Sequence, residues 1–339
     1  MKSHCYAFTV KDLLPIVGLP LVPLGLFALF LHAGAALRIL PPPVAALDTD
    51  RTILLHQATA GRQRHDAGTI LIGDSSCLMD VSAPQLTTIL TSHGAALNLG
   101  TLSYLDLNAF AALLRRYTAA NPVRPDTVVL LMNPEALRRP AAEDYDLEAL
   151  ERFYSQTDDC PPTLSPLLCG LGVEIFRGRL LSRSVPIPLP GSFGGYYGFT
   201  HDLWRYLSSH QGSAVDPGRY DPAFAVGNAE YRLARTLESA SAVFRAAVPA
   251  GTKLCVGITP LPESFVLANF GEVRGRLLAG WSQWLKADLA LARLPATMPD
   301  HLFASPTHLN PAGARAYTTL LAAALQGEPS TRPQRPKLQ

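Results

Sequence analysis

The stretch TILIGDSSCLMD, residues 69–80, decides how the rest of the chain is interpreted. Its first part is an uninterrupted apolar run, which is typical of a strand covered on both faces in a parallel sheet. The run stops at Gly73, and a carboxylate and two hydroxyl groups follow, those of Asp74, Ser75 and Ser76. Glycine and aspartate alone would make a turn, so the serines either cap the next helix or are candidates for chemistry.

The same rhythm recurs along the chain and predicts an α/β fold. Three further apolar runs follow in the sequence: ALNLG, DTVVLLMN and TKLCVGITP. Apolar residues at helical spacing predict helices at 103–120, 228–248 and 310–325, the last with Asn310 as N-cap and a proline at its first position. Strands that alternate with helices predict a parallel sheet with helices on both faces.

An apolar stretch near the N-terminus predicts a membrane anchor. Residues 13–37 contain no Asp, Glu, Lys or Arg, and at helical rise they can cross a hydrocarbon core of about 30 Å. Because Lys2 and Lys11 precede the stretch, the positive-inside rule places the N-terminus in the cytoplasm and the remaining chain in the periplasm or outside the cell. A cleaved signal peptide is the alternative, since residues 33–36 are small.

The chain therefore divides into an N-terminus in the cytoplasm, a single-pass anchor in the inner (cell) membrane, a proline-rich linker with a first helix, an α/β domain and a disordered tail. Their expected bounds are 1–11, 12–38, 39–65, 66–326 and 327–339. Proline, glycine and aromatic residues interrupt the α/β rhythm at about 140–227. Such an insertion is expected to line or cover the site.

Composition argues against several classes of function. The 29 basic and 27 acidic residues are dispersed, so a nucleic acid is not an expected partner. The nine histidines lack the spacing of a metal site, and no metal is expected. The glycine-rich stretch at 191–198 follows no strand and lacks the lysine of a phosphate-binding loop, so no cofactor is expected either.

Ser75 and His308 form the candidate catalytic pair. Ser75 follows a predicted strand, and ligands of open α/β sheets bind at the carboxyl ends of the strands. His308 lies in the loop before the last predicted helix. With Gly100 after the second apolar run and Asn133 at the end of the third, this order of residues resembles the SGNH (GDSL) hydrolase family.

The resemblance implies a three-layer α/β/α domain, flavodoxin-like and similar to SGNH hydrolases, with Ser75 as nucleophile and His308 as base. It also implies an oxyanion hole made by Ser75, Gly100 and Asn133. Gly100 and Asn133 each have a second interpretation as turn residues, because glycine and asparagine are common in turns between strands and helices. The stretch LLMNPEAL departs from the Gly-x-Asn-Asp of the family.

A second departure concerns the carboxylate that orients the histidine. The family usually has Asp three residues before the histidine, and this chain has Ser305 there. The expected site is therefore a Ser–His dyad, with Ser305 or a backbone carbonyl as a possible orienting group for the ring. Asp74 is expected to brace the turn, and Asp300 lies too far along the loop to be assigned to the site.

Two neighbours of Ser75 are rival nucleophiles. Ser76 is set aside because Ser75 has the position of the nucleophile in the motif. Cys77 is expected to pack as a small buried residue with an inert thiol.

Together with the predicted anchor, the resemblance implies an extracytoplasmic serine esterase or O-acetyltransferase that acts on a cell-surface polysaccharide or exopolysaccharide such as cellulose or alginate. The resemblance also implies a multispanning acyltransferase or a polysaccharide synthase as the protein partner. Aromatic residues in the insertion are candidates for stacking on sugars or for packing the insertion onto its domain: Phe193, Tyr196, Tyr197, Phe199 and Trp204. The alternatives are a non-catalytic domain that binds polysaccharide or scaffolds a complex, and an esterase for lipids.

Overall fold

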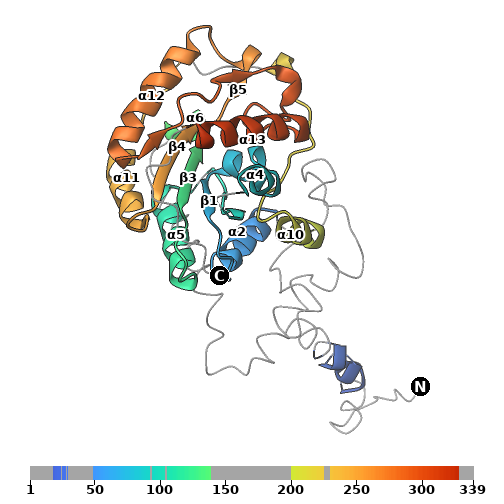
Figure 1. Cartoon of the computed structure of the whole chain (residues 1–339). Coiled ribbons are helices and arrows are strands. Elements are labelled where there is room, and N and C mark those ends of the chain that lie inside the picture. Colours follow the sequence, from blue (N-terminus) through green and yellow to red (C-terminus); the bar gives the residue numbers. More distant parts are fainter. Residues whose placement is uncertain are drawn as a thin grey trace, which may run out of the picture.

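The computed structural model describes the main part of the predicted α/β domain and short pieces of the N-terminal region (Figure 1). The described residues are 18–23, 25–27, 29, 49–91, 94–103, 105–138, 200–224 and 230–327. Within them the chain folds as an α/β domain with helices on both sides of a parallel sheet, which confirms the predicted fold class.

The sheet has five parallel strands in the order β2-β1-β3-β4-β6. This order is consistent with a flavodoxin-like fold. The strands are β1 (Thr69–Gly73), β2 (Ala96–Asn98), β3 (Thr127–Met132), β4 (Lys253–Ile258) and β6 (Leu289–Ala290). A separate pair of short parallel strands consists of β5 (Leu261–Pro262) and β7 (Thr297–Met298). The four predicted apolar runs are confirmed as strands. Strand β6 was not predicted, because it has only two residues and no apolar run marks it in the sequence.

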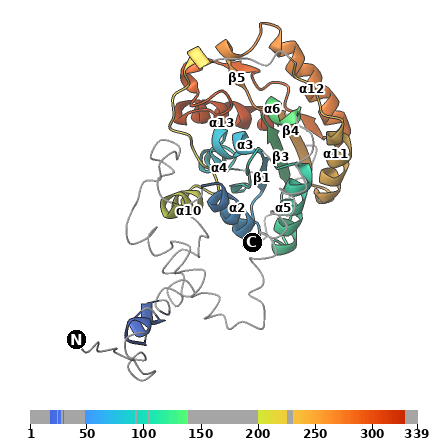
Figure 2. The ribbon, with the colours of Figure 1, turned by 180° about the vertical axis from the view of Figure 1, so that it is seen from behind.

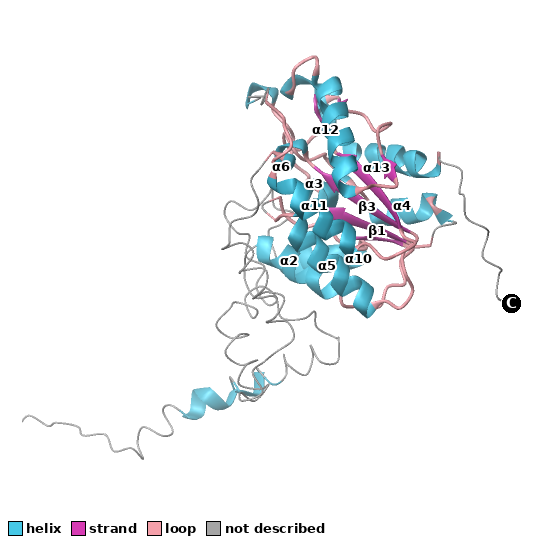
Figure 3. Ribbon diagram, turned by 90° about the vertical axis from the view of Figure 1, so that its left-hand side faces the viewer, coloured by secondary structure: helices cyan, strands magenta, loops and turns pink. Residues whose placement is uncertain are grey.

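Helices cover both faces of this sheet (Figures 2 and 3). The described helices are α2 (Thr49–Ala60), α3 (Ser75–Asp80), α4 (Ala83–Ile89), α5 (Leu107–Ala120), α6 (Pro134–Leu137), α10 (Thr200–Ser209), α11 (Thr236–Ala247), α12 (Phe270–Leu285) and α13 (Pro311–Gln326). Helices α5, α11 and α12 lie on one face, and α4 and α13 lie on the other (Figure 3).

The two cores follow from the alternation of side chains along the strands. In β1, Ile70 and Ile72 pack toward α5 and α11, and Leu71 packs toward α4 and α13. Trp281 of α12 fills the first core and Tyr317 of α13 the second, and both are fully buried. Every residue of β1 is buried, as the unbroken apolar run predicts for a central strand of a parallel sheet.

The predicted helix start is confirmed for α13 but not for the other two predicted helices. The helix expected from residue 103 begins at Leu107, with Asp106 as its N-cap. Asn310 caps α13 by accepting hydrogen bonds from two backbone N–H groups, and Pro311 is the first helical residue, as predicted. The helix expected from residue 228 is wrong in its start, because α11 begins at Thr236. Before it, the Ala234 N–H donates to Leu137 O, a long-range bond that replaces the helical one.

The predicted anchor and tail fall mostly outside the described residues. Residues 18–23, 25–27 and 29 are helical, and the rest of 12–38 is not described. Within the described parts of the chain, no helix combines the length and the apolar character that a membrane crossing requires. The tail beyond Gly327 and the insertion from 139 to 199 also lie outside the described residues.

Candidate active site

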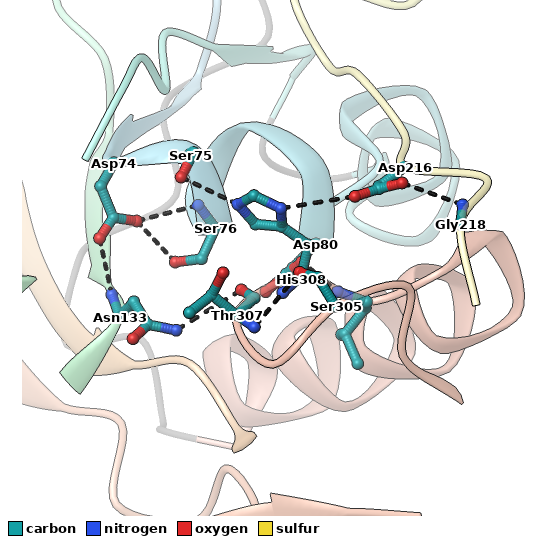
Figure 4. A network of polar contacts seen from close by, with 11 residues as sticks. Asp74, Ser75, Ser76, Asp80, Asn133, Asp216, Gly218, Ser305, Thr307 and His308 are labelled. Carbon is teal, nitrogen blue, oxygen red and sulfur yellow. Dashed lines mark hydrogen bonds and ion pairs between the residues drawn. The ribbon is translucent and has the colours of Figure 1, made fainter. Parts of the chain in front are cut away.

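The candidate site lies at the carboxyl edge of the sheet, between β1 and β3 (Figure 4). Strand β2 pairs with one side of β1, and β3 pairs with the other, so the strand order reverses at this point. Such a reversal is where open α/β sheets bind their ligands. Ser75 follows β1 and Asn133 follows β3, which brings the two predicted site residues to the same edge.

Gly73 makes the turn out of β1 possible. A Cβ atom there would lie 1.8 Å from Leu131 O, so no other residue fits against β3. Asp74 then caps α3 and accepts hydrogen bonds from Ser76 N–H (3.0 Å), Ser76 Oγ (2.6 Å) and Asn133 N–H (2.8 Å). Asp74 therefore braces the turn and joins the ends of β1 and β3, as expected.

The pKa of Asp74 reflects two opposing effects. Burial raises the pKa of this carboxyl group, while the hydrogen bonds from Ser76 and Asn133 and the nearby His308 oppose the rise. The Asp74 side chain is used by these donors and does not face the free nitrogen of His308.

Ser75 and His308 meet as the sequence predicts. The distance from His308 Nε2 to Ser75 Oγ is 2.9 Å, although the residues are separated by 233 positions. Ser75 is the first residue of α3 and is partly exposed, so its hydroxyl group is open to a ligand. With Nε2 as acceptor, the serine O–H donates to the imidazole, which is the arrangement that a nucleophile and its base require.

The loop that carries His308 is fixed by its own hydrogen bonds. Ser305 Oγ accepts from Thr307 N–H (3.3 Å) and His308 N–H (3.1 Å), and Ala304 N–H donates to His308 O (2.9 Å). Ser305 thus shapes the loop through the backbone, and its hydroxyl group is engaged away from the imidazole nitrogens. Asp300 accepts from Ser264 N–H and is likewise engaged elsewhere.

Asp216 supplies the carboxylate that the sequence analysis did not find. Its Oδ2 atom lies 3.5 Å from His308 Nδ1, within ion-pair distance, on the side of the ring opposite Ser75 (Figure 4). The side chains of Asp216 and His308 are 5% and 12% exposed. His308 Nδ1 is buried and has no hydrogen-bond acceptor among the described residues, so Asp216 is the carboxylate placed to balance its proton.

Backbone hydrogen bonds of the 211–216 segment position Asp216 beside His308. Asn98 N–H at the end of β2 donates to Gln211 O (2.8 Å), and Ala214 N–H donates to Leu78 O in α3 (3.0 Å). Asp216 Oδ1 then accepts from Gly218 N–H (2.9 Å), which closes a local turn. The expected Ser–His dyad without a carboxylate is therefore corrected to a Ser75–His308–Asp216 arrangement.

The backbone N–H of Gly100, which the resemblance implies as an oxyanion donor, is engaged within the protein. Its N–H donates to Asn98 Oδ1 at 2.8 Å, so this donor is already used inside the protein. A Cβ atom on Gly100 would lie 2.5 Å from the backbone nitrogen of Leu78. The absence of a side chain at Gly100 therefore lets the end of β2 pack closely against α3.

Two donors remain for a developing oxyanion. The Ser75 N–H has no acceptor among the residues that the structure describes, and it belongs to the residue that carries the nucleophile. Asn133 caps α6 through its Oδ1, which accepts from Glu135 N–H, while its Nδ2 makes, within the described parts of the chain, a single long contact of 3.5 Å with Thr307 O. Asn133 is thus both a helix cap and a source of an available N–H group.

The rival nucleophiles are buried. Ser76 Oγ donates to Asp74 and accepts from Thr259 Oγ1 (3.0 Å), so its hydroxyl group is held inside the domain. Cys77 is a free, buried cysteine, and burial together with Asp74 and Asp80 raises the pKa of its thiol well above the usual range. The burial of Cys77 is as expected, and an enclosed thiol that is not ionised is a poor nucleophile.

Asp216 was missed because its sequence context has another explanation. Asp-Pro-Gly at 216–218 is a turn signal, and the turn is indeed present. Moreover, Asp216 lies in the insertion at about 140–227, where no strand or helix pattern indicates which residues return to the site. Of the aromatic residues considered for sugar binding, none has a described side chain.

The site contains no grouping that suggests a metal. Among the described residues, no cluster of three or more His, Cys, Asp or Glu side chains could hold one. Comparison of the sequence with protein-family models gave no match, and comparison with curated proteins gave none either.

Proposed function

We propose that the chain is a serine esterase or O-acyltransferase of the SGNH hydrolase type, which forms an acyl-enzyme on Ser75. The observation that carries the proposal is the position of the His308 ring, with Nε2 2.9 Å from Ser75 Oγ and Nδ1 3.5 Å from Asp216 Oδ2. A nucleophile, a base and a carboxylate that orients the base are the three parts of the Ser-His-Asp arrangement that performs acyl transfer.

The first half-reaction forms the acyl-enzyme. Ser75 Oγ attacks the ester carbonyl carbon while its proton passes to His308 Nε2, and the negative charge of Asp216 stabilises the resulting imidazolium. The carbonyl oxygen becomes an oxyanion facing the Ser75 N–H and the Asn133 amide. As the tetrahedral intermediate collapses, the bond to the leaving alcohol breaks and His308 returns the proton to that oxygen.

The second half-reaction releases the acyl group. His308 takes a proton from water or from a sugar hydroxyl group, whose oxygen attacks the acyl carbon on Ser75. The bond to Ser75 Oγ breaks and His308 reprotonates the serine. Water as the acceptor makes the protein an esterase, and a sugar hydroxyl group makes it a transferase.

The polysaccharide substrate is the further part of this proposal. It rests on the predicted anchor at 12–38, which would hold the domain at the outer side of the cell membrane, and on the resemblance to membrane-tethered SGNH-like proteins that accompany exopolysaccharide acetylation. Cellulose and alginate are examples of such acceptors. In this setting a multispanning acyltransferase or a polysaccharide synthase would be the partner that supplies the acyl group or the acceptor chain.

The position of Asp216 weakens the main argument for the non-catalytic alternative. That alternative rested on the missing aspartate and on the altered third block around Asn133, and a carboxylate now faces His308 from another loop. Measurement of ester hydrolysis distinguishes the catalytic proposal from the non-catalytic alternative. The full chain in detergent micelles is incubated with p-nitrophenyl acetate, alongside Ser75→Ala, His308→Gln and the control Ser76→Ala.

We expect release of p-nitrophenol by the parent chain and by Ser76→Ala, and loss of about a thousandfold or more in the other two variants. The Ser76 control is matched because it removes the neighbouring hydroxyl group, which is buried and faces Asp74. Equal rates in all four proteins would refute catalysis by Ser75.

A further inference from the structure

We propose that Asp80 is a positioning residue that acts as an uncharged carboxyl group and holds the His308 loop in register with Ser75. The proposal rests on the proposed function of the Ser75–His308 pair and names a group that this mechanism does not otherwise use. Asp80 is the last residue of α3, the helix that begins with Ser75. Figure 4 shows it next to the loop of His308.

The contact with the loop is a single backbone hydrogen bond. Leu309 N–H donates to Asp80 Oδ1 at 2.8 Å, one residue after the histidine. The two ends of α3 therefore hold the same loop, Ser75 through the imidazole ring and Asp80 through the adjacent backbone. A shift of this loop by a fraction of an ångström would lengthen the bond between base and nucleophile.

The surroundings of Asp80 favour the neutral form. The side chain is fully buried, and Oδ2 has no hydrogen-bond partner among the described residues. A buried carboxylate with one donor and no cation is costly, whereas a carboxylic acid loses much less on burial. Burial, with added repulsion from Asp74 and Asp216, accordingly raises the pKa of Asp80 well above the usual range.

The groups around Asp80 explain why its charge state matters. The titratable groups that interact with Asp80 come from α3, the 211–216 segment and α13: Asp74, Cys77, Asp216 and Tyr317. Strands β1 and β3, which pack against α3, contain none. His308 is the residue before Leu309, whose N–H donates to Asp80. An ionised Asp80 would add a second negative charge near the imidazole and favour the protonated ring, which cannot accept the Ser75 proton. A neutral Asp80 leaves Asp216 as the carboxylate that acts on the ring.

The test compares Asp80→Asn, which keeps a neutral acceptor, with Asp80→Leu, which has a similar shape and no acceptor. The full chain in detergent is treated with diethyl pyrocarbonate over a range of pH, and modification of His308 is followed by mass spectrometry of its peptide. This reagent reacts with neutral imidazole, so the readout does not depend on turnover. Thermal unfolding of both variants selects a temperature at which each is folded.

We expect Asp80→Asn to leave the pH midpoint and rate of His308 modification unchanged. Asp80→Leu should keep the midpoint but raise the rate several-fold, because the freed loop exposes the ring. A midpoint that falls by about one pH unit in Asp80→Asn would show that Asp80 is ionised and overturn the proposal. An unchanged rate in Asp80→Leu would equally overturn the positioning role, whatever the outcome of the ester assay.

Discussion

Asp216 Oδ2 lies 3.5 Å from His308 Nδ1, and the carboxylate reaches the ring from a loop about 90 residues before the histidine in the chain. Neither residue is near the other in sequence, and the position three residues before the histidine holds Ser305, whose hydroxyl group shapes the backbone. The carboxylate of the site has thus been supplied by the 211–216 segment.

Asp216→Asn and Asp216→Ala should reduce the rate of Ser75 acylation by at least about a hundredfold while leaving the fold intact. The physical reason is the loss of the negative charge that stabilises the imidazolium, a loss that costs serine proteases about ten-thousandfold. Acylation is measured as the initial burst with p-nitrophenyl acetate. Asp221→Asn is the matched control, because Asp221 is exposed in the same loop and accepts a backbone N–H. A control as slow as the Asp216 variants would contradict a specific role.

Ser305→Asp should partly restore activity to the Asp216→Ala variant. The new carboxylate would stand three residues before His308, and its oxygen could still accept the N–H groups that Ser305 Oγ accepts. We expect a recovery of about tenfold or more in burst rate over the single variant. Absence of recovery in a folded double variant would show that a carboxylate at position 305 does not replace that of Asp216.

Gly100→Ala should destabilise the domain by about 1–3 kcal/mol. The new methyl group would meet the backbone of α3 at Leu78, which cannot move without shifting Ser75. Urea unfolding of the two proteins measures the difference. Gly275→Ala in α12 is the matched control, since nothing lies within 4 Å of its added Cβ, and there alanine should be neutral or stabilising. Equal effects at both positions would refute the close packing at Gly100.

Asp80→Asn should become increasingly stabilising as the pH rises above about 4. The pKa of Asp80 is raised in the folded protein, so between the unfolded and folded pKa values only the unfolded chain has lost the proton. Stability of the parent chain then falls by up to about 1.4 kcal/mol per pH unit, and the asparagine variant is spared this loss. Urea unfolding of both proteins at pH 5 and pH 7 measures it, and a constant difference would contradict a raised pKa.

The sequence predicts those parts of the fold that depend on local pattern. The apolar runs at β1, β3 and β4 indicate buried parallel strands because no polar residue alternates in them. The cap and proline at Asn310 and Pro311 mark the start of α13 for the same local reason. The predicted start of α11 was wrong because a long-range backbone hydrogen bond from Ala234 N–H to Leu137 O competes with the helix.

The site was predictable to the extent that its residues stand at strand and helix ends. Ser75 follows β1, Asn133 follows β3 and His308 precedes α13. The topology of the sheet alone therefore brings these residues to one edge. Asp216 and Asp80 have no such marker. The first depends on pairing of the 211–216 segment with β2 and α3, and the second on a contact between the end of α3 and a loop more than two hundred residues away.

The most direct test of the Ser75–His308–Asp216 site is labelling of the full chain with a fluorophosphonate, followed by mass spectrometry to locate the adduct. We predict one adduct on Ser75, formed at the same rate in Ser76→Ala, much more slowly in Asp216→Ala and hardly at all in His308→Gln. An adduct on another residue, or labelling of Ser75 that does not depend on His308, would contradict the account.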